Sequence, residues 1–383
     1  MYDVFVAGLG VMGGAIARAF ARAGRRVLGC DARQPPHEFG SSHGESRIIR
    51  AAYFEDPVYA PLAQRAFELW RELESESGRS LLRVTGGLNM GPRAGVLVEG
   101  ALASARAHGI KHELLDGNEV VRRYPGYRVR ATDAAVFEPT AGILDPEQCV
   151  AAQLESARSA GADLRLGDPF IGWQRAQQGF EIETSSGRHQ ARMLVLTVGA
   201  WLSQFRPELP LKVTRQPVFW FEPTNPVLYS PDRLPHFLIE FEPGRIFYGF
   251  PDLGRGLKCA IHHEGVATSP DLVARSLAPT ELAVVRSLVA QFLPGALGPL
   301  RTFGICLYTN LPDGHFLLDR DPQNSDLWLV SACSGHGFKF APPLAELLLA
   351  AQSGSAIPEC FSLQRLARFT PWLTKPPFIE LTS

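Results

Sequence analysis

The N-terminus combines two short apolar runs with one helical apolar repeat. Residues 2–7 are rich in valine and phenylalanine and predict a buried strand. The apolar side chains that follow recur at helical spacing before Gly24, a helix-ending residue; they are Ala15, Ile16, Ala19, Phe20 and Ala23. Residues 26–30 predict a second strand. The pattern therefore predicts a strand–helix–strand unit, the building block of a parallel sheet.

Three more helices are predicted from apolar spacing and capping residues. Residues 57–74 place Leu62, Ala66, Leu69, Trp70 and Leu73 on one face of an amphipathic helix. Asp145 as N-cap and Pro146 at the first helical position predict a helix that runs to residue 159. A later apolar run predicts a helix over residues 344–349.

Short strands follow the second of these helices. They are predicted over residues 163–166, 180–184 and 193–198, and the last one closes on Gly199. A small antiparallel meander followed by an apolar strand that ends in glycine resembles the FAD-binding fold of the glutathione-reductase superfamily. A two-half NAD domain would instead keep alternating strand and helix.

Two intervals do not fit a nucleotide-binding domain, because they are rich in aromatic residues, proline and strand-like runs such as 218–221 and 245–250. We interpret residues 82–144 and 213–314 as an inserted α+β substrate domain built on a mixed sheet. Residues 1–81, 145–212 and 315–383 then form the FAD-binding domain. The predicted fold class is α/β, with the insert carrying the substrate side of the site.

Composition narrows the functional classes. The chain has 383 residues and a net charge of −1, which suits two sizeable cores and gives no electrostatic footprint for nucleic acid or an acidic membrane. No apolar run approaches the roughly 20 residues needed to span a bilayer. The N-terminus enters strand-like sequence at once, so we expect a cytoplasmic protein. The six cysteines form no Cys-x-x-Cys pair, and we expect neither a disulfide framework nor a metal site.

The turn after the first strand carries the spacing Gly8-x-Gly10-x-x-Gly13, with Val11 and Met12 between the last two glycines. In this pattern the glycines allow a tight turn, a close backbone approach to a pyrophosphate and close helix–strand packing. Asp31 lies 18 residues after Gly13, where a carboxylate would bind a ribose hydroxyl. The motif predicts dinucleotide binding.

Four further segments hold candidate chemistry that is ambiguous by itself. Arg47 and Arg50 are three residues apart, which would bring them to the same side of a helical turn, yet two solvated arginines are the commoner case. Lys258 by itself suggests a surface lysine, and Cys306 a small core thiol. The glycine-rich segment 334–339 precedes a predicted helix, where backbone amides favour an anion.

Taken together, these motifs resemble the sarcosine oxidase family of flavoproteins, which includes sarcosine, N-methyltryptophan and pipecolate oxidases. The matching strings are residues 8–13, 40–50, 256–258, 302–319 and 334–339, and the likeness is thinnest across 85–145 and 205–245. The resemblance implies that Arg47 lies against the flavin ring and that Cys306 binds the flavin through a thioether. It implies that Arg50 and Lys339 bind the substrate carboxylate, and that Lys258 activates dioxygen.

The same resemblance implies further site residues. Tyr248, His262 and Tyr308 match substrate-pocket positions, although the loop after Tyr248 is one residue shorter than the family pattern. The other cofactor-binding residues that it implies are Ser41, His43, Ser46, Gly199, Trp201, Gly335, His336, Gly337 and Phe338. Ser46 stands where threonine is common, which keeps the hydroxyl.

The expected function is FAD-dependent oxidation of a secondary α-amino acid, N-methyl or cyclic, to an imine, with reduction of dioxygen to hydrogen peroxide. We expect a monomer that works on a small-molecule substrate. A flavin amine dehydrogenase with another electron acceptor is an alternative, and so is a flavin-binding protein without turnover. An NAD-linked dehydrogenase is a third. The sequence leaves open which secondary amino acid is the substrate.

Overall fold

The N-terminal strand–helix–strand unit lies at the centre of one of two large sheets. In this computed structural model, which describes residues 1–369, β1 (Tyr2–Ala7) leads into α1 (Val11–Arg22) and then into β2 (Val27–Asp31). Strand β1 pairs in parallel with β2 and with β12 (Gly187–Leu196). The predicted unit is confirmed. Strand β12 begins earlier than the predicted residue 193, because its first half pairs antiparallel with a neighbour.

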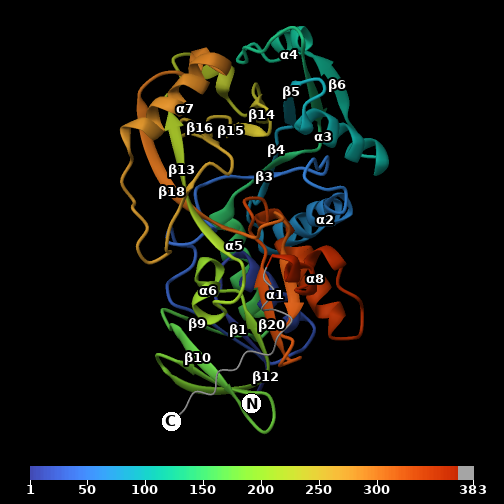
Figure 1. Ribbon diagram of the computed structural model, residues 1–383, viewed down its shortest axis with the longest axis vertical. Coiled ribbons are helices and arrows are strands. Elements are labelled where there is room, and N and C mark those ends of the chain that lie inside the picture. The colour runs from blue at the N-terminus through green and yellow to red at the C-terminus, as the bar shows by residue number, and fades with distance from the viewer. Residues whose placement is uncertain (370–383) are drawn as a thin grey trace.

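This first sheet has eight strands and occupies the lower end of the molecule, near the N-terminus (Figure 1). Its other strands are β9 (Asp163–Leu166), β10 (Phe170–Arg175), β11 (Phe180–Thr184), β19 (Leu317–Arg320) and β20 (Leu327–Ser331). Strands β10, β11 and β12 form an antiparallel meander, as predicted, but its first strand differs from the prediction. Residues 163–166 form β9, which pairs in parallel with β2, and β10 was not predicted. The helices α5 (Pro146–Ser159) and α8 (Ala341–Ala351) pack against α1. The glutathione-reductase-type arrangement is therefore as predicted.

A nine-stranded mixed sheet occupies the upper end (Figure 1). Its strands are β5 (Gly87–Pro92), β6 (Glu113–Asp116), β7 (Asp133–Glu138), β13 (Lys212–Phe221), β14 (His236–Glu242), β15 (Arg245–Phe250), β16 (Leu257–Ile261), β17 (Val266–Ala267) and β18 (Leu300–Asn310). Its helices are α3 (Val96–Ala107), α4 (Gly117–Arg123) and α7 (Pro279–Phe292). The long strands β13 and β18 run down from this sheet toward the first one (Figure 1).

A three-stranded sheet lies between the two ends and draws on both predicted domains. It consists of β3 (Arg47–Ile49), β8 (Gly142–Leu144) and β4 (Leu82–Val84). Strand β3 corrects one expectation: Arg47 begins this strand and Arg50 directly follows it, so the two lie on extended backbone and not on a turn of helix. The domain division itself remains an interpretation, and its last range extends beyond the described residues.

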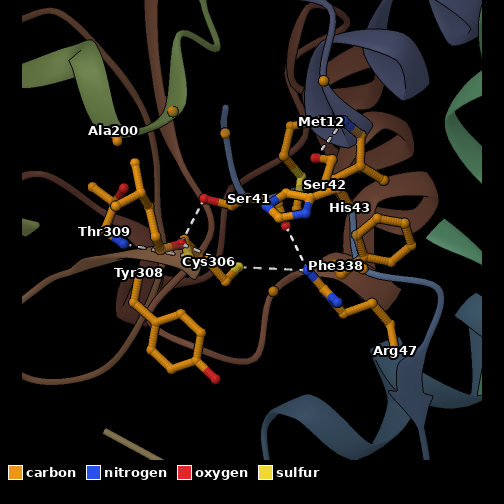
Figure 2. A pocket seen from close by; sticks show the side chains of 18 of the residues that line it. Met12, Ser41, Ser42, His43, Arg47, Ala200, Cys306, Tyr308, Thr309 and Phe338 are labelled. Carbon is orange, nitrogen blue, oxygen red and sulfur yellow. Dashed lines mark hydrogen bonds between the residues drawn. The ribbon is translucent and has the colours of Figure 1, made fainter. Parts of the chain in front are cut away.

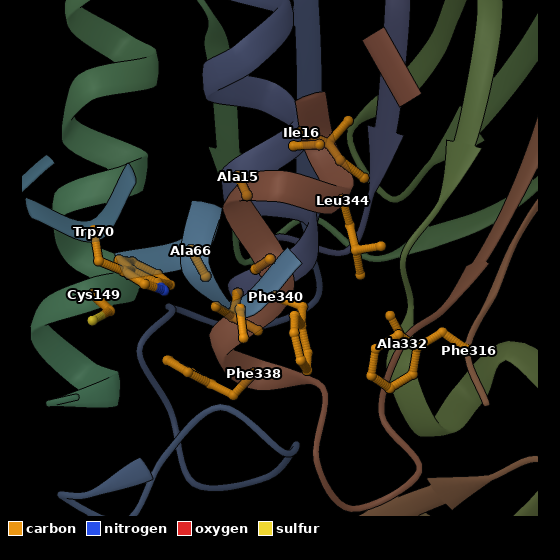
Figure 3. Packing of buried hydrophobic residues seen from close by; sticks show 14 of the residues in the cluster. Ala15, Ile16, Ala66, Trp70, Cys149, Phe316, Ala332, Phe338, Phe340 and Leu344 are labelled. Carbon is orange, nitrogen blue, oxygen red and sulfur yellow. The ribbon is translucent and has the colours of Figure 1, made fainter. Parts of the chain in front are cut away.

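The apolar core between α1, α2 (Tyr59–Ser77), α5 and α8 anchors the segment that precedes α8 (Figure 3). Trp70 of α2 stacks on Phe338 with ring centroids 6.0 Å apart, and its indole N–H donates to the Lys339 carbonyl at 2.9 Å. Helix α8 begins three residues before the predicted start. Proline is accepted in a first helical turn, where no backbone N–H is needed, so Pro342 and Pro343 do not delay it. Packing therefore fixes the position of Lys339.

Candidate active site

A cavity of about 450 Å³ is lined by residues from both large sheets and from the three-stranded sheet between them. Every predicted site residue lines it except Gly13. Gly13 has a different reason to be glycine: a Cβ there would stand 1.8 Å from the Gly8 carbonyl oxygen, so the residue lets α1 pack against the turn.

In the glycine turn, the backbone lines this cavity without side chains to cover it. Gly8 has φ of 91°, in the left-handed region, and a Cβ there would approach the Thr197 carbonyl oxygen at 2.6 Å. Helix α1 has Gly10 as its N-cap, with no side-chain capping hydrogen bond and no acidic residue in its first turn. The Val11 amide donates to the Ser42 hydroxyl at 3.1 Å, a contact that sequence reasoning missed. This surface suits a pyrophosphate.

Asp31 ends β2 on the wall of the same cavity. One carboxylate oxygen accepts from the Leu9 amide at 2.8 Å, and the other accepts from the Arg33 amide at 2.8 Å. A carboxylate oxygen can accept more than one hydrogen bond, so the group can still bind a hydroxyl. The structure thus shows Asp31 also holding the turn in shape.

Cys306 lies on β18, and cationic and polar groups surround it (Figure 2). The Arg47 guanidinium donates to its Sγ at 3.6 Å and to the Ser41 carbonyl at 2.9 Å. The Ser41 hydroxyl donates to the Leu307 carbonyl at 2.6 Å. The segment 41–47 is thereby fastened to β18 beside the sulfur, and a cation stands next to a thiol that faces the cavity.

His43 lies on the same segment (Figure 2). Its Nε2 is buried and has no hydrogen-bond partner among the described residues. Burial, together with the charges of Arg47 and Lys258, lowers the pKa of His43 to about 3. The imidazole is therefore neutral near pH 7 and leaves one ring nitrogen for a bound molecule.

Lys258 projects from β16 into a cage of neutral acceptors. Its ammonium donates to the Gly44 carbonyl, to the Ser46 carbonyl at 3.2 Å and to the Ser46 hydroxyl at 3.0 Å. The rings of Trp220 and Phe250 lie 5.3 and 5.0 Å from Nζ. Burial lowers the pKa of Lys258 well below its usual value, and Arg47 adds to this effect. The ammonium form of Lys258 is therefore costly, because only uncharged groups are in hydrogen-bond contact with it among the described residues.

Arg50 is paired inside the protein, which its sequence did not reveal. Its guanidinium donates to both carboxylate oxygens of Glu55 at 2.7 and 2.8 Å and to the Ala52 carbonyl at 2.9 Å. Burial alone would lower the pKa of Arg50, but the charge and hydrogen bond of Glu55, together with Tyr53 and Glu138, raise it, and the net shift is upward. The available signal was an acid five residues after Arg50 in the same segment.

Among residues 1–369, Lys339 has no carboxylate in hydrogen-bond contact. Its Nζ donates to the His336 carbonyl at 2.8 Å and to the Tyr53 hydroxyl at 3.1 Å. Burial and the Arg50 charge lower the pKa of Lys339 to about 7, against an opposing effect of Glu55. The ammonium form is therefore easily lost near neutral pH, and an added anion would stabilise it.

Tyr248, His262 and Tyr308 form an aromatic wall of the cavity. The Tyr308 hydroxyl and His262 Nδ1 are 3.4 Å apart. Burial lowers the pKa of His262 well below its usual value and raises that of Tyr248 to about 12. All three groups are consequently neutral near pH 7. They can hold a substrate by shape and hydrogen bonds without adding charge.

The segment 334–339 turns tightly above this wall. Gly335 has φ of 76°, and a Cβ there would lie 2.7 Å from the Tyr308 ring. A Cβ at Gly337 would lie 1.8 Å from the Ala332 carbonyl oxygen. The His336 ring is fixed between the Tyr53 hydroxyl at 2.8 Å and the Gly314 carbonyl at 2.9 Å. Both glycines are therefore required by close approach.

Gly199 and Trp201 line the cavity near the end of β12. Gly199 has φ of 58°, and the indole N–H of Trp201 donates to the Asp271 carboxylate at 2.7 Å. Sequence reasoning did not single out several other lining residues: Arg33, His37, Val150, Thr197, Phe205, Trp220, Phe250 and Cys333. None belongs to a local motif, and only the fold brings them together.

The residues present fit FAD. The cavity is lined by Asp31, the N-terminus of α1, Arg47 and Lys258, and the unpartnered His43 nitrogen belongs to a lining residue. An acid for a ribose, the N-terminus of a helix for a pyrophosphate and cations near the reacting groups match the parts of a flavin dinucleotide.

Comparisons with known proteins agree with this geometry. The family described as FAD dependent oxidoreductase matches residues 3–351. A monomeric sarcosine oxidase from Streptomyces avermitilis is 37% identical over 91% of this chain and 92% of its own length. An N-methyl-L-tryptophan oxidase from Yersinia pestis is 32% identical over 96% of this chain and 99% of its own.

Solved structures share the fold. NikD, described as an unusual amino acid oxidase, covers 93% of this chain with a TM-score of 0.81 and 24% identity, and the alignment spans 95% of NikD. An L-proline dehydrogenase from P. horikoshii covers 96% of this chain with a TM-score of 0.84 and 20% identity, over 98% of its own length. At these identities the likeness concerns the fold alone.

Proposed function

Because the chain belongs to the FAD-dependent oxidoreductase family, we propose that it oxidises the C–N bond of a secondary α-amino acid and passes the electrons to dioxygen. The product would be an imine, with hydrogen peroxide as the second product. The observation that carries the proposal is the presence, around one cavity, of a lysine in a neutral cage and of a separate pair of cations suited to a carboxylate. The relatives named above act on N-methyl amino acids, which supports this substrate class.

The cofactor would be held by the groups that line the cavity. Gly8, Gly10 and the first amides of α1 would bind the pyrophosphate, and Asp31 a ribose hydroxyl. FAD, when bound, would accept the two electrons from the substrate and pass them to dioxygen. Arg47 and His43 would lie on the flavin side, where the neutral His43 offers its free nitrogen.

Substrate binding would use Arg50 and Lys339. Arg50 already holds a carboxylate, that of Glu55, through both oxygens of that group. A single guanidinium nitrogen, Nη2, makes both contacts. A substrate carboxylate can compete with Glu55 for this nitrogen, because guanidinium groups bind carboxylates through charge-assisted hydrogen bonds. Lys339 would add a second cation, whose protonated form the bound anion stabilises.

The reacting amine must be neutral, and the aromatic wall favours that form. Tyr248, His262 and Tyr308 are uncharged near pH 7 and buried. They would orient the amine by hydrogen bonds while excluding water. Arg50 and Lys339 further disfavour an ammonium group nearby, because like charges repel in a poorly solvated site.

Lys258 would act in the oxygen half of the reaction. Electron transfer to dioxygen creates negative charge, and a fixed cation in a water-poor site stabilises that charge strongly. The ammonium of Lys258 is held by neutral acceptors only, so its charge is not already shared with an anion in contact.

We further propose that the FAD is covalently attached through the sulfur of Cys306. The Arg47 guanidinium beside Sγ supports this, since a cation stabilises the thiolate that must react. Acid precipitation followed by intact-mass measurement tests it. The protein should stay yellow and weigh one FAD more than its chain, and Cys306→Ala should release its colour. Colour lost from the unaltered protein would overturn the attachment and leave the oxidase proposal standing.

A peroxide-coupled screen of secondary amino acids tests the activity. We expect peroxide with at least one N-methyl or cyclic α-amino acid, and none with the matching amine that lacks the carboxylate. Flavin that is reduced by substrate without air, yet yields no peroxide in air, would favour the dehydrogenase alternative. A colourless protein expressed with ample riboflavin would overturn the cofactor assignment.

We also propose that the protein is a cytoplasmic monomer and that it binds neither nucleic acid nor a membrane. The relatives named as monomeric sarcosine oxidases support the oligomeric state, which size-exclusion chromatography with light scattering would test. No helix within residues 1–369 is long and apolar enough to cross a bilayer. Across those residues, no group of three or more His, Cys, Asp or Glu side chains is placed to hold a metal ion.

A further inference from the structure

The acceptors around Lys258 belong to a loop whose backbone conformation is unfavourable by itself. Two of the three acceptors are carbonyls, those of Gly44 and Ser46, and the third is the Ser46 hydroxyl. Gly44 has φ of 99° and Glu45 has φ of 68°. The left-handed region is unfavourable for a glutamate, so the loop needs an external hold to keep its carbonyls on the ammonium.

Glu147, in the first turn of α5, supplies that hold. One of its carboxylate oxygens accepts from the Gly44 amide at 2.6 Å, and the other accepts from the Glu45 amide at 3.1 Å. The carboxylate therefore bridges the two residues with left-handed backbone. The side chain of Glu45 also pairs with Arg255, but that pair is exposed on the Arg255 side, where ion pairs contribute little.

The charged groups around Lys258 also indicate a role for Glu147. The titratable and charged groups that face Lys258 are Arg47 of β3, His43 of the loop, Cys306 of β18 and Glu147 of α5. Among them Glu147 is the carboxylate, and its charge favours the protonated lysine, whereas Arg47 opposes it. Gly44 lines both the main cavity and a second one of about 460 Å³, which Glu147 also lines. Gly44 and Glu147 therefore lie where the two cavities share a lining residue, next to the acceptors of Lys258.

We propose that Glu147 is a positioning residue for the oxygen half of the reaction: it holds the 44–46 loop, and with it the acceptors of the ammonium, around Lys258. The inference rests on the proposed role of Lys258. Glu147 lies outside the motif strings, and its effect on the reaction would pass entirely through Lys258.

Rapid-mixing kinetics of the holoenzyme provides the test, with flavin reduction and reoxidation measured separately. Glu147→Ala should slow reoxidation roughly tenfold or more, because small misplacements of a catalytic group are costly, while reduction by substrate stays unchanged. In a Lys258→Met background the same change should add nothing, since its effect passes through the lysine. Glu155→Gln is the matched control: it removes an exposed carboxylate from the same helix and should leave both steps unchanged.

Two readouts separate positioning from general loss of structure. Glu147→Gln removes the charge and keeps an acceptor, so the decline of reoxidation with rising pH should move to lower pH, because the lysine then loses its proton more easily. Hydrogen exchange should accelerate in peptides covering residues 43–47 of Glu147→Ala and not across β16.

The outcomes also separate the two claims. If Lys258→Met slows reoxidation and neither Glu147 variant does, the inference is wrong and the proposed function stands. If Lys258→Met itself leaves reoxidation unchanged, the proposed oxygen role fails and the inference fails with it.

Discussion

Lys258 and Arg50 are both buried cations on the wall of one cavity, 4% and 3% exposed, yet their partners differ in charge. Lys258 is surrounded by carbonyls, a hydroxyl and aromatic faces. Arg50 is neutralised by the Glu55 carboxylate in a geometry that uses both of its oxygens. A buried cation without an anionic partner is costly, and a paired one is far less so.

The difference suits different tasks. An uncompensated charge is useful where negative charge appears only transiently, because nothing has to be displaced before it acts. A compensated charge is useful where a stable anion must enter and leave, because Glu55 can occupy the guanidinium in the absence of substrate. Lys339 lies between these cases, with neutral partners and the Arg50 charge nearby.

The largest expected effect comes from removing the uncompensated charge. Lys258→Met should slow flavin reoxidation by on the order of 10²–10³, the usual cost of losing one preorganised electrostatic group. Reduction by substrate should be nearly unaffected, since the carboxylate cations remain. Stopped-flow measurement of the two half-reactions checks this, and an equal loss in both would remove the distinction between the two cations.

Arg50→Ala should act on the other half-reaction. We expect the substrate KM and the Kd of simple carboxylate inhibitors to rise about 10- to 100-fold, the cost of a charge-assisted hydrogen-bonded pair. The flavin should remain bound and reoxidise normally. Inhibitor titrations followed through the flavin spectrum give the Kd; an unchanged value would place the substrate carboxylate elsewhere.

The lowered pKa of Lys339, about 7, predicts a pH dependence of carboxylate binding. The protonated form binds the anion, so affinity should be full below pH 7 and fall as pH rises through 7, by about tenfold for one charged contact. His262 and His336, whose pKa values are lowered by burial, are already neutral in this range. Lys339→Met should abolish the dependence, and a dependence that persists in this variant would assign it to another group.

Glu55→Gln gives the smallest effect and the sharpest test of competition. If Glu55 occupies the guanidinium that the substrate uses, weakening that occupant should tighten carboxylate inhibitors, by about fivefold for roughly 1 kcal/mol. Glu68→Gln, which alters an exposed carboxylate on α2, serves as the control. Weaker inhibitor binding in Glu55→Gln would mean that Glu55 only orients Arg50.

Local sequence determined the frame of this protein. The strand–helix–strand unit, the glycine spacing and the capped helix that starts at Pro146 are encoded over short distances, where periodicity and turn chemistry act, and the structure confirms them. Of the predicted meander, the structure confirms the pairing of its last two strands, whereas residues 163–166 pair with β2 instead. Resemblance of motif strings located Arg47, Lys258, Cys306 and the 334–339 segment, because those residues stand in contiguous patterns. All four line the cavity.

The tertiary structure alone decided which charges are compensated. Glu55 pairs with Arg50, Tyr53 holds Lys339, and Glu147 reaches the Gly44 and Glu45 amides from about one hundred residues away. The β-structure at Arg47, where a helical turn was conceivable, also came from pairing with a distant strand. The periodicity of a sequence indicates which face of a helix or strand is buried. It does not indicate which side chains from other elements contact that face, and these contacts determine the energetic cost of burying a charge.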